Sequence, residues 1–287
     1  MKMSRGYWTD KIASLDAEVS YCEIYRILFA FEFPWDMNQS LSFALYRTYA
    51  VPSIGGLLAR TGELTDRTQK RYDDTALLLE RVLRSGFDSG DGRTALRRIN
   101  QMHHAFDISN DDFRYVLSTF VVVPRRWIDR FGWRQLSEAE VRASVLYYRD
   151  LGHHMGIRDI PDSYLGFEEL LESYEADHFG RDEGALSVSE ATLRLMTTFP
   201  PNHLLPASVS RRMALALMDD RLLDAFGYPH PTALERRLME TGLRLRGRVV
   251  GLLPPRRTAR WVEGMSHVRS YPTGVATELL GVEAGVD

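Results

Sequence analysis

Apolar residues recur at intervals of three and four along almost the whole chain, and this period constrains the fold more than any other feature. After Asp16, for example, one apolar face is expected to consist of Val19, Ile24, Ile27, Leu28 and Phe31. Alternating apolar and polar residues, which are typical of half-buried strands, are scarce. A period near 3.6 residues is that of an amphipathic helix. The sequence therefore predicts an all-α fold.

Capping residues and helix breakers delimit several of these helices. Thr65 or Asp66 is expected to cap a long helix, and Ser109 is expected to cap a later one. Ser137 and Glu140 have the spacing of a capping box, a reciprocal pair of hydrogen bonds at a helix start. Later helices are expected over residues 163–178, 187–198, 207–223 and 231–251, with an irregular tail over 264–281.

The chain of 287 residues is long enough to bury a full core. It contains no internal repeat and no low-complexity linker. The proline-rich stretch 199–206 is the best candidate boundary, yet the sequence on both sides is helical and similar in composition. We therefore expect a multi-helix single domain with a helical core over 1–206. A C-terminal helical extension with an irregular tail, over 207–287, should pack on the same domain.

Composition excludes several classes of protein. Cys22 is the only cysteine, which excludes a disulfide scaffold and a zinc site with two or more thiolates. No window approaches the roughly 18 uninterrupted apolar residues of a membrane span, and residues 1–10 lack the apolar core of a signal peptide. The net charge of -3 argues against a nucleic-acid binder. We therefore expect a soluble, cytoplasmic protein.

The segment 235–260 is the most basic part of the chain. It contains eight Arg and two Glu, a local charge of +6 in a chain whose total is -3. Two alternatives follow from its mixture of Arg and Leu. The segment is an amphipathic basic helix that contacts an anionic membrane, or it is a solvated Arg face over a buried Leu face. The first alternative predicts peripheral contact with the inner face of a membrane.

Histidines are the most informative residues for chemistry, because neutral imidazole is the commonest ligand for transition metals. Glu175 and His178 have the E-x-x-H spacing of di-iron carboxylate proteins, but those sites need two such motifs and the chain has one. His103 shares an apolar helix face with Ile99, whereas His104 points about 100° away. An imidazole on an apolar face is how many proteins hold haem iron, and a satisfied core histidine is the alternative.

A second polar group lies in the preceding helix. Arg71 and Thr75 are i,i+4 neighbours, and Asp74 lies beside them. They form either an ordinary solvated Arg–Asp pair or, because three leucines follow directly, a partly buried turn. A buried Arg, Asp and Thr opposite a buried His would form a polar pocket in an apolar core, which is the usual composition of an active site.

Together these segments resemble the family of MpaB-type oxygenases and rubber oxygenases (latex-clearing proteins). The resemblance covers roughly residues 67–151 and, more loosely, their flanks. The motifs that carry it are Arg71-x-x-Asp74-Thr75, His103 in Arg98-Ile-Asn-Gln-Met-His103, Ser109-Asn-Asp-Asp112-x-x-Tyr115 and Phe120-Val-Val-Val-Pro124-x-x-Trp127.

The resemblance implies a globin-like helical core that binds b-type haem, with O2-dependent oxygenase activity. His103 matches the axial ligand of the iron, and Arg71 and Thr75 match the Arg and Thr of the family's distal turn. Asp74 stands where rubber-cleaving members have Lys, which replaces a cation by an anion beside the iron. We expect Arg71 to hydrogen-bond O2 or a propionate, Asp74 to act as a general base if burial raises its pKa, and Thr75 to orient O2 or water.

The leading hypothesis is a haem-dependent oxygenase that acts with O2 on a small apolar substrate of isoprenoid or lipid type. A non-catalytic haem carrier or sensor with the same ligand is the second hypothesis. The third is a helical scaffold without a cofactor that acts by association.

Overall fold

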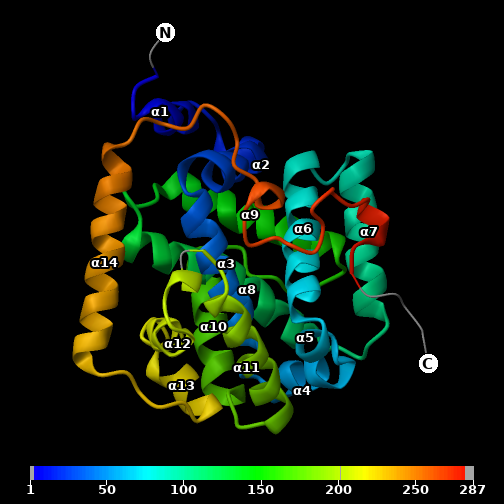
Figure 1. Ribbon diagram of the computed structural model, residues 1–287. Helices are drawn as coiled ribbons and strands as arrows, with labels where there is room; N and C mark the ends of the chain where they lie inside the picture. Colours follow the sequence, from blue (N-terminus) through cyan, green and yellow to red (C-terminus); the bar gives the residue numbers. More distant parts are fainter. Residues whose placement is uncertain (1–2, 201, 282–287) are drawn as a thin grey trace.

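The structure, a computed structural model, describes residues 3–200 and 202–281 (Figure 1). Within these ranges it contains fourteen α-helices, short 3-10 and π segments, and no strand, which confirms the predicted all-α class. The helices stack around one hydrophobic core. No helix in the described ranges is both long and apolar enough to cross a bilayer.

The helices are short, with few exceeding five turns. The first seven are α1 (Tyr7–Ala13), α2 (Ala17–Ile27), α3 (Pro34–Thr48), α4 (Pro52–Thr61), α5 (Glu63–Asp66), α6 (Thr68–Ser85) and α7 (Gly90–His104). The second seven are α8 (Asn110–Phe131), α9 (Glu138–His154), α10 (Tyr164–His178), α11 (Glu183–Thr197), α12 (Ala207–Leu215), α13 (Asp220–Phe226) and α14 (Ala233–Leu252). The shorter segments are η1 (Leu28–Glu32), η2 (Asn202–Leu204), η3 (Val262–Gly264) and η4 (Thr277–Leu279).

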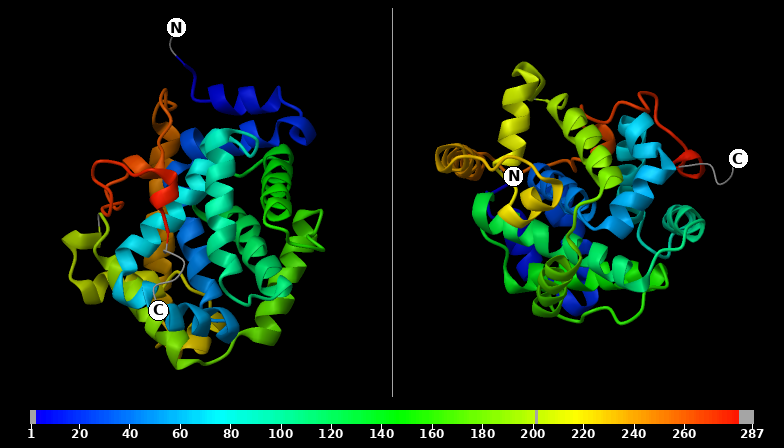
Figure 2. Two further views of the ribbon diagram at one scale, coloured as in Figure 1. Left: turned by 90° about the vertical axis from the view of Figure 1, so that its right-hand side faces the viewer. Right: turned by 90° about the horizontal axis from the view of Figure 1, so that it is seen from below.

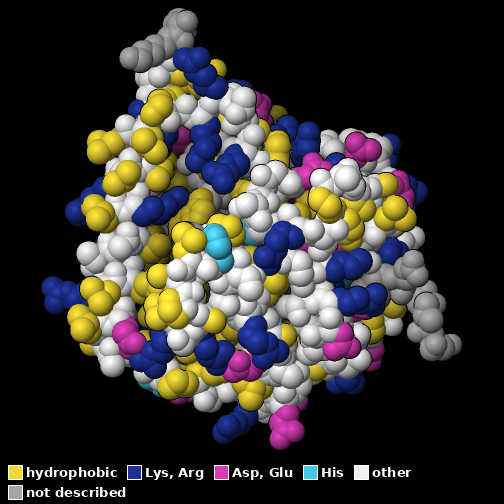
Figure 3. Space-filling model, in the orientation of Figure 1, with side chains coloured by type: hydrophobic (Ala, Val, Ile, Leu, Met, Phe, Trp, Pro, Cys, Tyr) yellow, Lys and Arg dark blue, Asp and Glu magenta, His cyan; other side chains and the backbone are white. Residues whose placement is uncertain are grey.

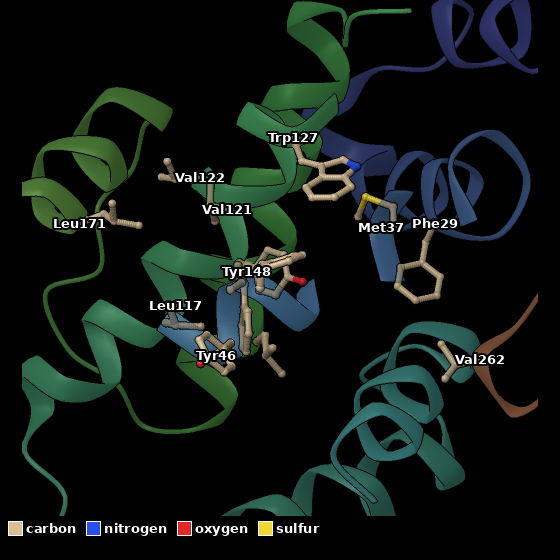
Figure 4. Close-up of a cluster of buried hydrophobic side chains, with 14 of the residues drawn as sticks. Phe29, Met37, Tyr46, Leu117, Val121, Val122, Trp127, Tyr148, Leu171 and Val262 are labelled. Atoms are coloured by element: carbon tan, nitrogen blue, oxygen red, sulfur yellow. The ribbon is translucent and has the colours of Figure 1, made fainter. Parts of the chain in front are cut away.

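Helix α8 is at the centre of the packing. It contacts α3, α9 and α10, while α2 packs on α9, α4 on α11, and α6 on α7. Figure 4 shows Met37 and Tyr46 of α3 facing a cluster that includes Leu117 and Trp127 of α8. The tight packing of these apolar faces explains why the 3.6-residue period is so persistent in the sequence.

The structure confirms two of the predicted helix starts and contradicts two other expectations about where helices begin. Ser109 accepts a hydrogen bond from the backbone N–H of Asp112, and Ser137 with Glu140 forms the expected capping box. The expected cap of α6 at Thr65 or Asp66 is wrong, because those residues belong to α5 and the chain bends at Arg67. The single helix expected over 207–223 is also wrong. The structure has two helices there, because Asp219 caps the start of α13.

A buried ion pair fastens α3 to α10 and α13. Arg47 donates from Nε and Nη2 to the two carboxylate oxygens of Glu175, each at 2.6 Å, and from Nη1 to Asp219 at 2.6 Å. Tyr115 of α8 donates to the same Glu175 at 3.1 Å. Burial alone would lower the pKa of Arg47, but its hydrogen bonds and charge interaction with Glu175 raise that pKa above its usual value. The contacts of Arg47 and Glu175 therefore join α3, α8, α10 and the start of α13.

Candidate functional site

The residues predicted to be catalytic lie where α6 packs against α7. Arg71 and Thr75 are on successive turns of α6, and the guanidinium Nη1 donates to Thr75 Oγ1 at 2.5 Å. His103 lies in the last turn of α7. The Arg71 cation is close enough to His103 to act on the pKa of its imidazole. The structure therefore brings Arg71, Thr75 and His103 together.

His103 has the properties of a ligand without a partner. Its side chain is half-buried, and its ring meets Phe113 edge-on at 5.3 Å between centroids. The Nδ1 atom is buried and makes no hydrogen bond of normal geometry among the described residues, although the ring interacts with the backbone of Ile99 one turn earlier. Burial, and then the charge of Arg71, lower the pKa of the imidazole to about 4. The ring is therefore neutral at physiological pH, as metal ligation requires. The neighbouring His104 is exposed.

Asp74 is buried, and donors engage both of its carboxylate oxygens. Lys70 donates to one oxygen at 2.7 Å, and Tyr271 of the C-terminal tail donates to the other at 2.5 Å. Lys70 also donates to the carbonyl oxygen of Gly281 at 3.1 Å. In this arrangement Asp74 fastens the tail to α6. Its role as a general base stays a prediction.

Hydrogen bonds to side chains of α6 and α7 also hold the rest of the tail, which lies beside α6 (Figures 1 and 2). Asp73 accepts hydrogen bonds from the backbone N–H groups of Arg269 and Ser270, each at 3.0 Å, and from the Ser270 hydroxyl at 2.7 Å. Arg98 of α7 donates to the carbonyl of Leu280 at 2.7 Å. The tail therefore bridges the two helices that carry Arg71 and His103.

An apolar cavity of about 60 Å³ lies along α6. Side chains of α2, α3, α8 and α9 surround it, and α6 contributes Tyr72, Ala76 and Glu80 among others. Arg71, Thr75 and His103 do not line it. Sites for drug-sized ligands usually measure about 300–1,000 Å³, so this cavity holds only a few waters. A larger ligand between these helices therefore requires the lining side chains to move apart.

Glu80 is a buried carboxyl group at this cavity that the sequence analysis did not identify. It accepts hydrogen bonds from the backbone N–H groups of Val262 and Glu263. Burial raises its pKa to about 7. The sequence pattern that could have identified Glu80 is its position on an otherwise apolar helix stripe formed by Tyr72, Ala76 and Leu83.

The raised pKa of Glu80 predicts a pH-dependent stability. Folding favours the protonated carboxyl, so the stabilisation is complete below pH 4.5, the usual pKa, and is lost as the pH rises through about 7. The loss amounts to about 3 kcal/mol at most. Urea unfolding at pH 5 and pH 8 should show that Glu80→Gln gains stability relative to the unmodified protein at the higher pH. An identical difference at both pH values would contradict this assignment.

Other candidate ligands do not assemble into a metal site. Glu175 is buried against Arg47, whereas His178 is exposed and stacks on Tyr174, so the E-x-x-H spacing forms no ligand pair. No group of three or more His, Cys, Asp or Glu suited to a metal ion occurs in the described part of the chain. His267 of the tail is the other histidine with an unpartnered buried nitrogen there, and burial lowers its pKa as well.

The chain is similar to known oxygenases. It is 30% identical over 247 residues to the ER-bound oxygenase mpaB' of Penicillium brevicompactum, covering 79% of this chain and 58% of that protein. It is 33% identical over 152 residues to mpaB of the same organism, covering 50% of this chain and 39% of that protein. With mpaB of Penicillium roqueforti (strain FM164) the identity is 29% over 216 residues, or 69% of this chain and 72% of that one.

The first two relatives are considerably longer than the aligned segment, so this chain spans about half of their length. The profile of the family described as "ER-bound oxygenase mpaB/B'/Rubber oxygenase, catalytic domain" matches residues 40–256. This segment contains α6, α7 and the residues Arg71, Asp74, Thr75 and His103, and it runs across the boundary predicted near residue 206. The chain belongs to the family of ER-bound mpaB oxygenases and rubber oxygenases.

Proposed function

We propose that this chain is a haem-dependent oxygenase that acts with O2 on an apolar substrate of isoprenoid or lipid type. One observation carries the proposal. A neutral, half-buried imidazole with an unpartnered nitrogen, His103, lies beside the Arg71–Thr75 turn in a member of an oxygenase family.

The chemistry of the donors on α6 and α7 suits a b-type haem, and side chains between the helices would have to move apart to admit it, because the cavity along α6 measures about 60 Å³. His103 would hold the iron, because its neutral ring can ligate without first losing a proton. Arg71 would donate hydrogen bonds to a haem propionate or to O2, since its guanidinium has donors besides the one given to Thr75. A bound haem supplies the iron at which O2 is activated.

The protein's own contribution is orientation and the exclusion of water. The Thr75 hydroxyl donates to the carbonyl of Arg71 at 3.0 Å and accepts from its guanidinium, which fixes both side chains on one face of α6. Lys70 places an ammonium against Asp74, so the turn keeps a cation although Asp74 stands where rubber-cleaving members have Lys. We propose that Asp74 holds or accepts a proton only when Tyr271 of the tail releases it.

Oxygen consumption by the haem-loaded protein tests the proposed activity, with squalene as an isoprenoid probe and linoleic acid as a lipid probe. Removing one preorganised donor at a reacting oxygen typically costs about 100-fold or more in turnover. Arg71→Ala should therefore lower turnover about 100-fold while the haem content stays the same. Arg97→Ala is the matched control, because Arg97 is an exposed residue of α7 that bonds only to Thr94 in the described structure.

Two further variants separate the roles of Asp74. Tyr271→Phe removes the tail's hydrogen bond and leaves the carboxylate, whereas Asp74→Asn removes the proton acceptor. Loss of turnover in Asp74→Asn alone would support a general base. Unchanged turnover in both Arg71→Ala and Asp74→Asn would show that neither residue takes part in catalysis. If the haem-loaded protein consumes no oxygen with either probe, the haem carrier or sensor hypothesis is favoured. If the protein binds no haem, the hypothesis of a scaffold without a cofactor is favoured.

The proposed location is the surface of a membrane on its cytoplasmic side. Relatives in Penicillium brevicompactum and Penicillium roqueforti are named ER-bound, and an apolar substrate partitions into lipid. We propose peripheral contact through 235–260.

A further inference from the structure

Helix α14 lies at the edge of the molecule (Figure 1), and its inward side is mixed, with Leu243 packed on the core beside Arg246 and Gly247. Arg246 donates to both carboxylate oxygens of the buried Asp36, at 2.6 and 2.8 Å, and its guanidinium lies 3.9 Å from the ring centroid of Trp35. Gly247 is the buried residue of the helix, and a Cβ there would lie 2.5 Å from the carbonyl oxygen of Phe131. Surface helices usually bury an apolar stripe. This helix buries only a narrow apolar stripe that includes Leu243, and an ion pair and a close glycine contact also hold it.

The outward face of α14 is apolar. At about 100° per residue, its exposed apolar side chains fall within about 60° of one another, along a helix about 30 Å long. Their exposed fractions run from 51% to 87%. The space-filling view shows them as a row down one edge (Figure 3). These residues are Leu234, Leu238, Leu245, Val249 and Leu252. The alternative of a buried Leu face is therefore wrong for them.

A second exposed apolar group adjoins this row. Leu204 of η2, Leu205 of the following turn and Val209 of α12 are exposed. Helix α12 is tied to α14 by the bidentate pair of Arg212 and Glu235, with N···O distances of 2.6 and 2.7 Å. With Leu253, these two groups account for nine of the fourteen exposed large apolar residues in the described ranges. Monomeric proteins rarely gather exposed apolar side chains in this way unless the surface binds something.

The rim of this surface is cationic. Arg237, Arg248 and Arg257 are exposed and have no carboxylate partner in the part of the chain that the structure describes. Arg256 lies near Arg5, Arg246 and Arg260, so positive charges gather at the C-terminal end of α14. The two glutamates of the helix are engaged by other arginines: Glu235 by Arg212, and Glu240 by Arg130 and Arg244.

We propose that the outward face of α14, together with η2 and the start of α12, docks onto an anionic membrane surface. The leucines would enter the boundary between headgroups and acyl chains, and the arginines would reach lipid phosphates from the rim. A second copy of the chain would present the same cationic rim, so self-association would place like charges together. Lipid phosphate is the partner whose charge complements the cationic C-terminal end of the helix.

Sedimentation with vesicles tests this surface on the unmodified full chain. The protein should bind vesicles of phosphatidylcholine with phosphatidylserine, bind far less to phosphatidylcholine alone, and lose binding at high salt. Leu245→Glu with Val249→Glu should weaken binding about tenfold or more, because it removes apolar burial and adds like charge. Arg248→Gln with Arg257→Gln should weaken it about fivefold per arginine. Leu279→Glu is the matched control, since Leu279 is 69% exposed on η4 at the opposite edge of the molecule.

Several outcomes would overturn the proposal. One is equal vesicle binding by the unmodified chain and the Leu245→Glu, Val249→Glu variant, and another is no binding to anionic vesicles at all. A dimer in solution that becomes a monomer in that variant would assign the surface to self-association. Unfolding temperatures should match among the variants, because all substituted side chains are exposed. The inference depends on the surface of α14 and not on His103, so vesicle binding and oxygen consumption can fail separately.

Discussion

Substitution of His103 by Ala is expected to abolish haem retention, which is the largest effect that the proposed site predicts. The neutral imidazole is the group that would ligate the iron in the proposed site, and Ala has no atom that can replace it. After haem loading and desalting, the haem content of the His103→Ala protein should fall to background, as measured by the pyridine haemochrome spectrum. The circular dichroism of the helices should not change.

Two other histidines serve as controls for this ligand assignment. His104→Ala should keep its haem, because His104 is exposed and turned away from α6. His267→Ala removes the buried tail histidine that also has an unpartnered nitrogen. If haem is lost from His267→Ala and kept by His103→Ala, then the tail and not α7 carries the ligand.

Arg47→Met is expected to cost about 3–5 kcal/mol in the free energy of unfolding, because removing one partner of a buried pair leaves the other charge uncompensated. Glu175 is only 3% exposed, and its other described hydrogen bond comes from Tyr115. Urea unfolding monitored by circular dichroism measures the loss. Because the pair of Arg47 and Glu175 joins α3 to α10, the whole bundle should unfold in a single transition at lower urea.

Arg211→Met is the matched control for burial. Arg211 makes the same bidentate contact with Glu190, at 2.6 and 2.7 Å, but both side chains are about one-third exposed. Exposed pairs contribute about 0–1 kcal/mol, so this variant should lose far less stability. Equal losses in Arg47→Met and Arg211→Met would show that burial does not set the strength of the Arg47 contact.

The helices were predictable where the signal is local. The capping box of Ser137 and Glu140 and the cap at Ser109 are contained within four residues, so the sequence specifies them directly. The break before α13 was missed because the apolar period continues through it and only Asp219 marks a new start. Tertiary contacts were not predictable in this way. The bond between Asp74 and Tyr271 joins residues 197 positions apart, and no local pattern announces it.

The orientation of α14 shows the same limit. Periodicity identifies an amphipathic helix but does not say which face is buried. Asp36, far away in the sequence, binds Arg246 on the inward side of α14, and the leucines on the other side of the helix are exposed. At the candidate site, the resemblance of the motifs led to Arg71, Thr75 and His103, and packing of α6 on α7 places them together. Glu80 was overlooked because a lone carboxylate on an apolar stripe belongs to no motif.

Titration of the purified protein with haemin, followed by its absorption spectrum, tests the central claim most directly. If His103 is a haem ligand, a sharp Soret band should grow and saturate at one haem per chain, and reduction should shift the band. A spectrum that stays equal to that of free haemin throughout the titration would contradict the account.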